Sequence, residues 1–265
     1  MNNKRNNGQG CPSRRDFNKL MVLGAACGAV LPLSTALGAG EKEVVGLSGI
    51  TKGADPKQRV KDAVLAVDNL DWLSRGDSVL IKPALNSGNT YPATTSPLAI
   101  AAMVELLKDR GAGRVVITDL SGILHVKLSE DKLRGSSRAL AESSGIAEAA
   151  RNAGAELYFA EEDGWSAFHE EEPAHGPNWK NPITMPDIVN EVDHIVLMPR
   201  CSRHLQAGSS LGMKAAVGWW RTDTRLEYHR DASTFQEKTA EANTVPSLVE
   251  KQRLVVTAAD KILAT

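Results

Sequence analysis

The stretch Ser78-Val79-Leu80-Ile81-Lys82-Pro83 decides the fold, because its apolar core has the length and composition of a buried β-strand. A helix follows, beginning at Ser96-Pro97 and repeating apolar side chains at helical spacing until Gly111 stops it. Residues 114–118 form the next apolar run. A strand, a helix and a strand in this order are typical of an α/β sheet.

The same alternation continues along the chain. Asp55-Pro56 begins a helix, with Asp as the cap and Pro at the first helical position. Apolar strands that alternate with helices predict an α/β fold, with a mostly parallel sheet, helices on both faces and a single domain. The further predicted elements are a helix at 145–153 and strands at 156–159, 194–198 and 253–257.

Residues 164–186 interrupt this alternation. They are rich in Gly, Pro, Trp and acidic residues, which predicts a long surface excursion. His169 and His175 in this segment are six residues apart, and Pro173 between them argues against a helix. We therefore interpret the stretch around them as a solvated acidic loop and not as a metal site.

The N-terminus carries the pattern of an export signal. Arg14 and Arg15 follow a polar leader, and a weakly apolar run extends behind them to about Leu37. This run is too short and too dilute for a stable membrane span, which needs about 20 strongly apolar residues. Residues 1–39 resemble twin-arginine signal peptides, which implies export of the folded protein by the Tat translocase to the periplasm. Residues 40–265 then form the α/β domain, with no membrane span after cleavage.

Composition excludes some classes of function. Removal of residues 1–39 takes away five basic residues and one acidic residue, which leaves 26 Lys and Arg against 31 Asp and Glu. A net charge of −5 argues against nucleic-acid binding, which requires a basic surface. Cys201 is then the one remaining cysteine, so the chain by itself forms no internal disulfide and holds no four-cysteine iron–sulfur cluster.

Polar residues gather after two of the predicted strands, where α/β sheets place their binding sites. Lys82 and Asn86, with the hydroxyls before the helix at Pro97, suit a phosphate or carboxylate, or serve as ordinary turn and capping residues. Asp119 and Ser121 follow the strand at 114–118. Asp119 is suited to a metal ion, to the ammonium of Lys82 if the two strands are neighbours, or to a loop cap.

A third polar cluster follows the strand at 194–198. Arg200, Arg203 and His204 lie there, with Lys214 further along the chain. In a net acidic domain this local excess of cations favours recognition of an anion over the alternative of an ordinary solvated surface. His204 is suited to act as an acid or a base, and Cys201 is either a reactive thiolate or a buried structural residue. The sequence contains no Gly-x-Gly-x-x-Gly motif and no Walker loop.

These clusters together resemble the family catalogued as domain of unknown function 362, from about Val44 to the C-terminus. The resemblance rests on Lys82-Pro83 with Asn86, on residues 115–122, on 192–204 and on Gly212-Met213-Lys214 with Gly218. Members often carry lysines in the basic turn where this chain has Arg200 and Arg203, so Lys82 and Lys214 are the matching amines. Some members are fused to ferredoxin-type iron–sulfur modules, which implies a redox association and a cluster held by a ferredoxin-type partner. The family tends to continue beyond Thr265, so we expect a C-terminus that is truncated relative to it.

We therefore expect an exported, redox-linked α/β enzyme that binds a small anionic molecule or a metal complex at the carboxyl ends of its strands. The alternative is a non-catalytic binding protein or accessory subunit, for which the same cations only hold an anion. No cofactor is identified by a motif. Asp119 and His204 are the expected proton carriers, and the expected ligand-binding residues are Lys82, Asn86, Ser121, Arg200, Arg203 and Lys214.

Overall fold

The computed structural model of the 265-residue chain describes residues 31–33, 45–49 and 55–264. Arg14 and Arg15 of the predicted signal lie outside the described residues. Further along the predicted signal, β1 (Leu31–Leu33) pairs antiparallel with β2 (Val45–Leu47). In the part of the chain that the structure describes, no helix is both long and apolar enough to cross a membrane.

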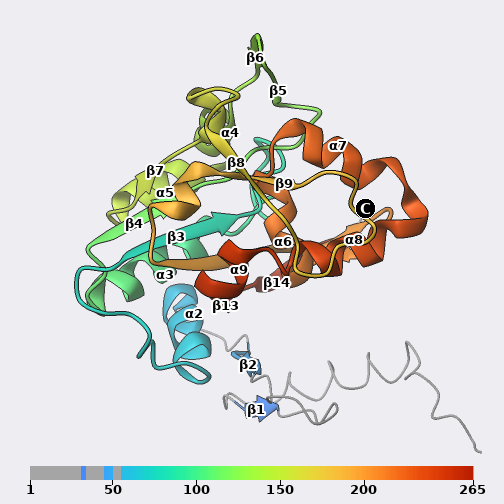
Figure 1. Cartoon of the computed structure of the whole chain (residues 1–265). Coiled ribbons are helices and arrows are strands. Elements are labelled where there is room, and N and C mark those ends of the chain that lie inside the picture. Colours follow the sequence, from blue (N-terminus) through green and yellow to red (C-terminus); the bar gives the residue numbers. More distant parts are fainter. Residues whose placement is uncertain (1–30, 34–44, 50–54, 265) are drawn as a thin grey trace, which may run out of the picture.

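A five-stranded sheet forms the centre of the molecule, and all its neighbouring strands run parallel (Figure 1). Across the sheet the order is β13-β10-β3-β4-β7. The chain builds outward from β3 to β7, then returns to place β10 on the other side of β3. The carboxyl ends of β3 and β10 therefore form the topological switch point, where open α/β sheets bind ligands. The strands are β3 (Ser78–Pro83), β4 (Arg114–Ile117), β7 (Glu156–Leu157), β10 (His194–Met198) and β13 (Gln252–Val255).

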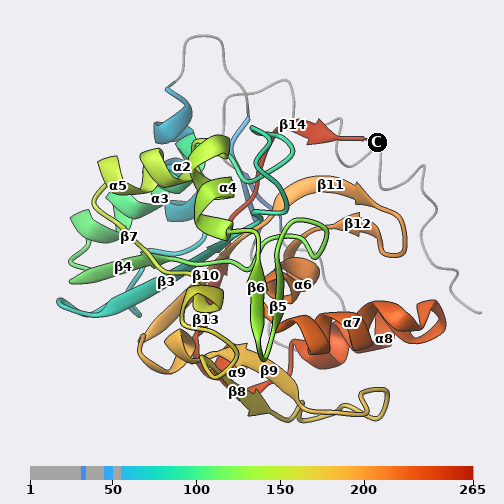
Figure 2. The same ribbon diagram turned by 90° about the horizontal axis from the view of Figure 1, so that it is seen from above.

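Helices cover both faces of this sheet, as the sequence predicts. Successive residues of a strand point to opposite faces, so Val79 and Ile81 belong to one apolar core and Leu80 to another. Figure 2 shows α2, α3 and α5 on one side of the sheet and α9 on the other. The helices of the first side are α2 (Pro56–Leu65), α3 (Pro97–Asp109), α4 (Ser137–Ser144) and α5 (Ile146–Asn152). Those of the second half of the chain are α6 (Gly212–Ala215), η4 (Ala216–Trp219), α7 (Thr222–Arg230), η5 (Ala232–Thr234), α8 (Phe235–Ala242) and α9 (Pro246–Lys251).

The starts of the first two described helices follow from their capping residues. The Asp55 carboxylate accepts a hydrogen bond from the Lys57 N–H (3.0 Å), and the Ser96 hydroxyl accepts one from the Ala99 N–H (3.4 Å). In both helices proline occupies the first turn, where no backbone donor is needed. Both predicted starts are confirmed. The predicted strand at 156–159 is shorter, because the chain turns into η2 (Ala160–Glu162) after Leu157.

The basic segment after β10 is a strand and not the turn that the sequence predicts. Residues Arg200–His204 form β11, which pairs antiparallel with β12 (Gly208–Ser210) and parallel with β14 (Ala258–Leu263). Residues 200–204 lack the alternation of apolar and polar side chains that would predict a strand from the sequence. This small three-stranded sheet extends beyond the carboxyl end of β10 and carries Arg200 and His204 with it.

The predicted surface excursion at 164–186 contains an ordered hairpin. Strands β8 (Phe168–Glu171) and β9 (Ile183–Pro186) pair antiparallel, and Trp179 between them is buried in a hydrophobic core. His169 lies between the carboxylates of Glu171 and Asp187, each 3.0 Å from a ring nitrogen. These contacts raise the pKa of His169 despite its partial burial. The prediction of a solvated loop is therefore wrong for residues 169–171, which belong to β8, whereas Glu172 and His175 after them are exposed and lie outside any strand. The remaining elements are β5 (Lys127–Ser129), β6 (Lys132–Arg134) and η3 (Asp187–Asn190).

Candidate functional site

A buried ion pair joins the carboxyl ends of β3 and β4. The Lys82 Nζ lies 2.8 Å from Asp119 Oδ1, and both side chains are almost fully buried. The two residues meet because β3 and β4 are parallel neighbours, so both strands end at the same edge of the sheet. Of the three roles expected for Asp119, the structure shows the partnership with the ammonium of Lys82. Burial lowers the pKa of Lys82, and the charge of Asp119 opposes that shift.

Asp119 also organises the loops around the pair. Its Oδ2 accepts a hydrogen bond from the Leu85 N–H (2.7 Å), and its Oδ1 accepts one from the Leu120 N–H (3.0 Å). The Lys82 ammonium donates to the Pro83 carbonyl (2.8 Å). These bonds fix the loops that leave β3 and β4. The geometry favours a positioning role for Asp119, and its predicted role as a proton carrier stays a prediction.

Gly218 closes over the ion pair. A Cβ at this position would lie 2.4 Å from Lys82 Nζ and 2.6 Å from Asp119 Oδ1, distances that real side chains do not tolerate. The turn α6–η4 thus approaches the strand ends closely because residue 218 has no side chain. Glycine here brings the preceding part of the same helical run, including Lys214, beside the switch point.

The hydroxyls before α3 serve as turn and capping groups in this structure. The Thr95 hydroxyl donates to the Met198 carbonyl, across the switch point, and accepts from the Ala84 N–H (2.8 Å). Ser96 caps α3, and the Thr94 hydroxyl donates to the Asn89 carbonyl (3.0 Å). Thr95 therefore ties β3 to β10. These contacts correspond to the turn and capping alternative for this cluster, and no ligand is needed to explain them.

Asn86 and Ser121 lie on the two loops that leave β3 and β4. The backbone of Asn86 approaches Gly122 so closely that a Cβ added to Gly122 would lie 2.7 Å from the Asn86 carbonyl oxygen. The Ser121 hydroxyl is buried and has no hydrogen-bond partner among the described residues. The Ser121 carbonyl accepts a hydrogen bond from the buried guanidinium of Arg225 (2.8 Å), which also donates to the Leu120 carbonyl (2.9 Å). Arg225 thus holds the loop after β4 and contributes a positive charge beside the pair.

A second group of cations lies next to the buried pair and lacks a carboxylate partner. We define the basic cluster as Arg200, His204 and Lys214, which are all partly exposed. Among the described residues, the Lys214 ammonium makes no hydrogen bond or ion pair. Burial lowers the pKa of Lys214 to about 8, and repulsion from Arg225, Lys82 and Arg200 adds to this shift.

His204 is neutral at physiological pH in this environment. Burial lowers its pKa to about 4, with further repulsion from Lys214, His229 and Arg200. Its Nδ1 accepts hydrogen bonds from the backbone N–H groups of Gln206 (3.2 Å) and Ala207 (3.1 Å). The single proton of the neutral ring is therefore on Nε2. This makes His204 a hydrogen-bond donor, and its assignment as an acid or base stays a prediction.

Two aromatic residues complete the cluster, and the sequence analysis missed both. The Lys214 Nζ lies 5.7 Å from the ring centroid of Tyr228 and 5.9 Å from that of Phe235. The ring of His204 stacks on Phe235 at 5.7 Å. Tyr228 and Phe235 come from α7 and α8, which are too polar overall to be recognised as elements facing a core. The sequence feature that could have linked these two aromatic residues to the site is their position a few residues from Arg225 and His229.

Arg203 is separated from the basic cluster. It is exposed, and it alternates with Ser202 and His204 along β11, so its side chain leaves the opposite face of the strand. It does not contribute to the pKa shift of His204 or Lys214. The structure thus brings Lys82, Asp119, Arg200, His204 and Lys214 to one region and leaves Arg203 outside it. Cys201 is a free, partly buried thiol on the Arg203 side.

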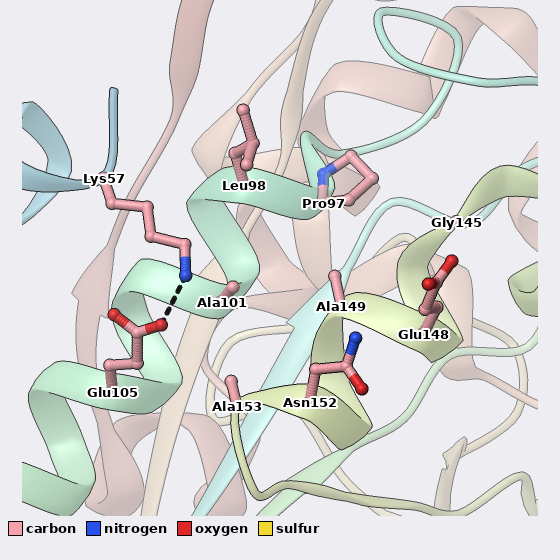
Figure 3. Close-up of a pocket in the computed structure, with 10 residues that line it drawn as sticks. All are labelled: Lys57, Pro97, Leu98, Ala101, Glu105, Gly145, Glu148, Ala149, Asn152 and Ala153. Carbon is pink, nitrogen blue, oxygen red and sulfur yellow. Dashed lines mark hydrogen bonds and ion pairs between the residues drawn. The ribbon is translucent and has the colours of Figure 1, made fainter. Parts of the chain in front are cut away.

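No metal centre is formed by the described residues, in which no group of three or more His, Cys, Asp or Glu side chains is arranged to hold an ion. A surface groove of about 420 Å³ lies elsewhere, between α3 and α5 (Figure 3). Leu98, Ala101 and Ala149 line it, and the ion pair of Lys57 with Glu105 lies at one end. None of the predicted site residues lines this groove.

Comparisons with known proteins place the chain in a family. A search of curated proteins gave no match. A solved structure from Thermotoga maritima, determined by the Northeast Structural Genomics Consortium, is 15% identical with a TM-score of 0.42. The alignment covers 72% of this chain and 44% of that chain, so the present chain spans less than half of that protein's length. The family model for domain of unknown function DUF362 matches residues 79–264, which include both the sheet and the basic cluster. The chain therefore belongs to the DUF362 family.

Proposed function

We propose that the protein binds a small anionic molecule at the basic cluster of Arg200, His204 and Lys214. The observation that carries this proposal is the unpartnered ammonium of Lys214, which has no acceptor among the described residues. Repulsion from three cations lowers the pKa of Lys214, and no carboxylate raises it again. Asp119 is already engaged by Lys82 and two backbone N–H groups. A bound anion would supply the missing negative charge.

The position of the cluster supports the same function. It lies beyond the carboxyl end of β10, beside β3, which is the switch point of the sheet. Crevices at that point are the usual ligand sites of open α/β sheets. One amino group of the Arg200 guanidinium donates to the Ala93 carbonyl, and its Nε has no partner among the described residues, so the side of the group that carries Nε is left for contacts with a carboxylate or phosphate. The neutral His204 offers an N–H donor. One anion can therefore receive both charge and directed hydrogen bonds.

Titration of the purified protein with oxalate and with inorganic phosphate, followed by calorimetry and thermal unfolding, tests this proposal. We expect at least one anion to bind and to raise the unfolding temperature. Arg200→Met and Lys214→Met should each weaken binding by about tenfold or more, since a hydrogen bond to a charged group contributes about 1.5–3 kcal/mol. Arg203→Met is the matched control, and its effect should stay within about twofold. Equal losses in all three variants, or no binding of either anion, would contradict the proposal.

We also propose that Arg14 and Arg15 direct the protein through the Tat translocase to the periplasm. The support is the sequence pattern, because these residues lie outside the described part of the chain. Replacement of both by lysine should leave the precursor in the cytoplasm, whereas replacement of Lys4 and Arg5 should leave export largely intact. Fractionation of cells that express each variant measures this. Export of the double lysine variant at the normal level would show that another signal acts.

A further inference from the structure

We infer that Lys214 is a nucleophilic amine that forms an imine with an anionic carbonyl compound, meaning an aldehyde or ketone that bears a carboxylate or phosphate. This inference rests on the proposed anion site and names the class of its ligand. Imine formation would be a covalent function of the cluster, in addition to the binding of an anion.

The first support is the contrast between Lys214 and the other buried lysines. The ammonium of Lys82 is paired with Asp119 at 2.8 Å. The ammonium of Lys238 donates to the Glu227 carbonyl (3.3 Å) and lies 4.0 Å from the Glu227 carboxylate. Among the described residues, the Lys214 Nζ has no comparable acceptor and faces the rings of Tyr228 and Phe235. An amine without an acceptor, in a partly apolar setting, keeps its lone pair available for reaction when it is uncharged.

Electrostatics increase the fraction of Lys214 that carries an uncharged amine. Burial and the neighbouring cations Arg225, Lys82 and Arg200 lower the pKa of Lys214 to about 8. The aromatic rings act in the opposite sense, because they attract a cation. However, their centroids lie 5.7 and 5.9 Å from Nζ, near the outer limit of about 6 Å for that attraction. Desolvation and repulsion therefore prevail, and at pH 7 a pKa of about 8 leaves roughly a tenth of the Lys214 side chains as the free amine, far more than the ordinary lysine pKa of 10.5 allows.

The surrounding cations determine which carbonyl compound fits. Arg200 attracts a carboxylate or phosphate, which brings a carbonyl on the same molecule close to Lys214. The Nζ lone pair then attacks the carbonyl carbon and forms the C–N bond, and the oxygen takes up a proton to give a carbinolamine. Loss of water, which carries away the oxygen and the two amine hydrogens, leaves the imine. No electron is transferred, so this step needs no oxidant or reductant.

Reductive trapping tests this inference. Purified protein is incubated at neutral pH with glyoxylate and cyanoborohydride, and modified lysines are located by peptide mass spectrometry. We expect Lys214 to be labelled faster than the exposed Lys127 by on the order of tenfold or more, because a pKa of about 8 instead of 10.5 leaves far more free amine. An excess of oxalate should protect Lys214 and leave Lys127 labelled at the same rate.

Lys214→Arg separates this inference from the proposed function. This variant keeps a positive charge but loses the nucleophilic amine, so trapping at position 214 should be lost while oxalate still binds measurably, more weakly than to the original protein. Oxalate binding without preferential trapping of Lys214 would overturn the inference and leave the anion site intact. Loss of preferential trapping together with no binding of either oxalate or phosphate would overturn both proposals. Labelling of Lys214 that oxalate does not reduce would show a reactive amine outside any anion site and would also overturn the inference.

Discussion

Two charged regions lie side by side: the buried pair of Lys82 with Asp119, and the basic cluster of Arg200, His204 and Lys214. Positive charge is compensated by a carboxylate in the first region and is uncompensated in the second. Lys82 is compensated by a carboxylate 2.8 Å away and is almost fully buried. Lys214 is surrounded by other cations and is partly exposed. The same type of side chain therefore supports the fold in one region and opposes it in the other. The contrast agrees with the proposed anion site, in which a ligand would neutralise the charge that the fold leaves uncompensated.

Removal of the compensated cation should have the largest effect. Lys82→Met leaves the Asp119 carboxylate buried without its cation, which we expect to lower the free energy of unfolding by about 3–5 kcal/mol. Urea unfolding followed by circular dichroism measures this loss. The double variant Lys82→Met, Asp119→Leu should recover only part of it, because the N–H groups of Leu85 and Leu120 lose their acceptor. A midpoint unchanged in Lys82→Met would show that the pair is not closed in solution.

A methyl group inserted over the pair should have the next largest effect. Gly218→Ala places Cβ within 2.4 Å of Lys82 Nζ and 2.6 Å of Asp119 Oδ1, so η4 or the pair has to move. We expect a loss of about 1–3 kcal/mol in the free energy of unfolding. Gly212→Ala, in the same helical run, is the matched control, because its nearest contact is a Val255 methyl group at 3.2 Å. Equal losses in the two variants would mean that Gly218 does not cover the pair.

Removal of the uncompensated cation should change stability in the opposite direction. Lys214→Met removes a desolvated charge and keeps an apolar chain against Tyr228 and Phe235, so we expect a gain of about 0.5–1 kcal/mol in the free energy of unfolding at neutral pH. The same denaturation experiment measures it. A loss as large as that in Lys82→Met would place Lys214 among the structural charges and would remove the contrast between the two regions.

The pH dependence of stability should give an effect about as small as that of Lys214→Met. In the unfolded chain His204 takes up a proton near its ordinary pKa of 6.5, whereas in the folded protein it does so near pH 4. The unfolded state therefore binds more protons between these values, and stability falls as the pH is lowered from 6.5 to 4. After allowance for partial solvent exposure we expect a contribution of about 1 kcal/mol. Denaturation at several pH values should show a weaker decrease in His204→Gln than in a control variant of the exposed His175.

Local patterns were sufficient to predict the main elements of the sheet. The strands around Val79, Val115 and Ile195 are short apolar runs, because parallel strands are buried on both faces. The helices at Pro56 and Pro97 begin with a capping side chain followed by proline, a signal that depends only on neighbouring residues. These features predicted the α/β class and the strand ends as the site of polar residues.

The patterns failed where burial did not match composition. Residues 200–204 are polar but form a strand, since their backbone pairs with β12 and β14 and their side chains remain partly exposed. The segment 164–186 is polar but forms a hairpin, since Trp179 packs against Trp220 and Tyr228 from distant parts of the chain. Patterns of neighbouring residues cannot predict these contacts, because the partners are far away along the chain.

Patterns of neighbouring residues were enough to predict most strands of the central sheet, the helices that begin at Pro56 and Pro97, and the polar side chains that follow several strands, because these features depend on positions a few residues apart. The folded structure was needed to show that Lys82 pairs with Asp119, that Gly218 covers them, and that Arg203 faces away while Lys214 lies beside Phe235. These relations depend on strand order and on the approach of segments that are well separated along the chain, such as Lys82 and Gly218. The chemistry of the site therefore arises from packing that composition and spacing do not encode locally.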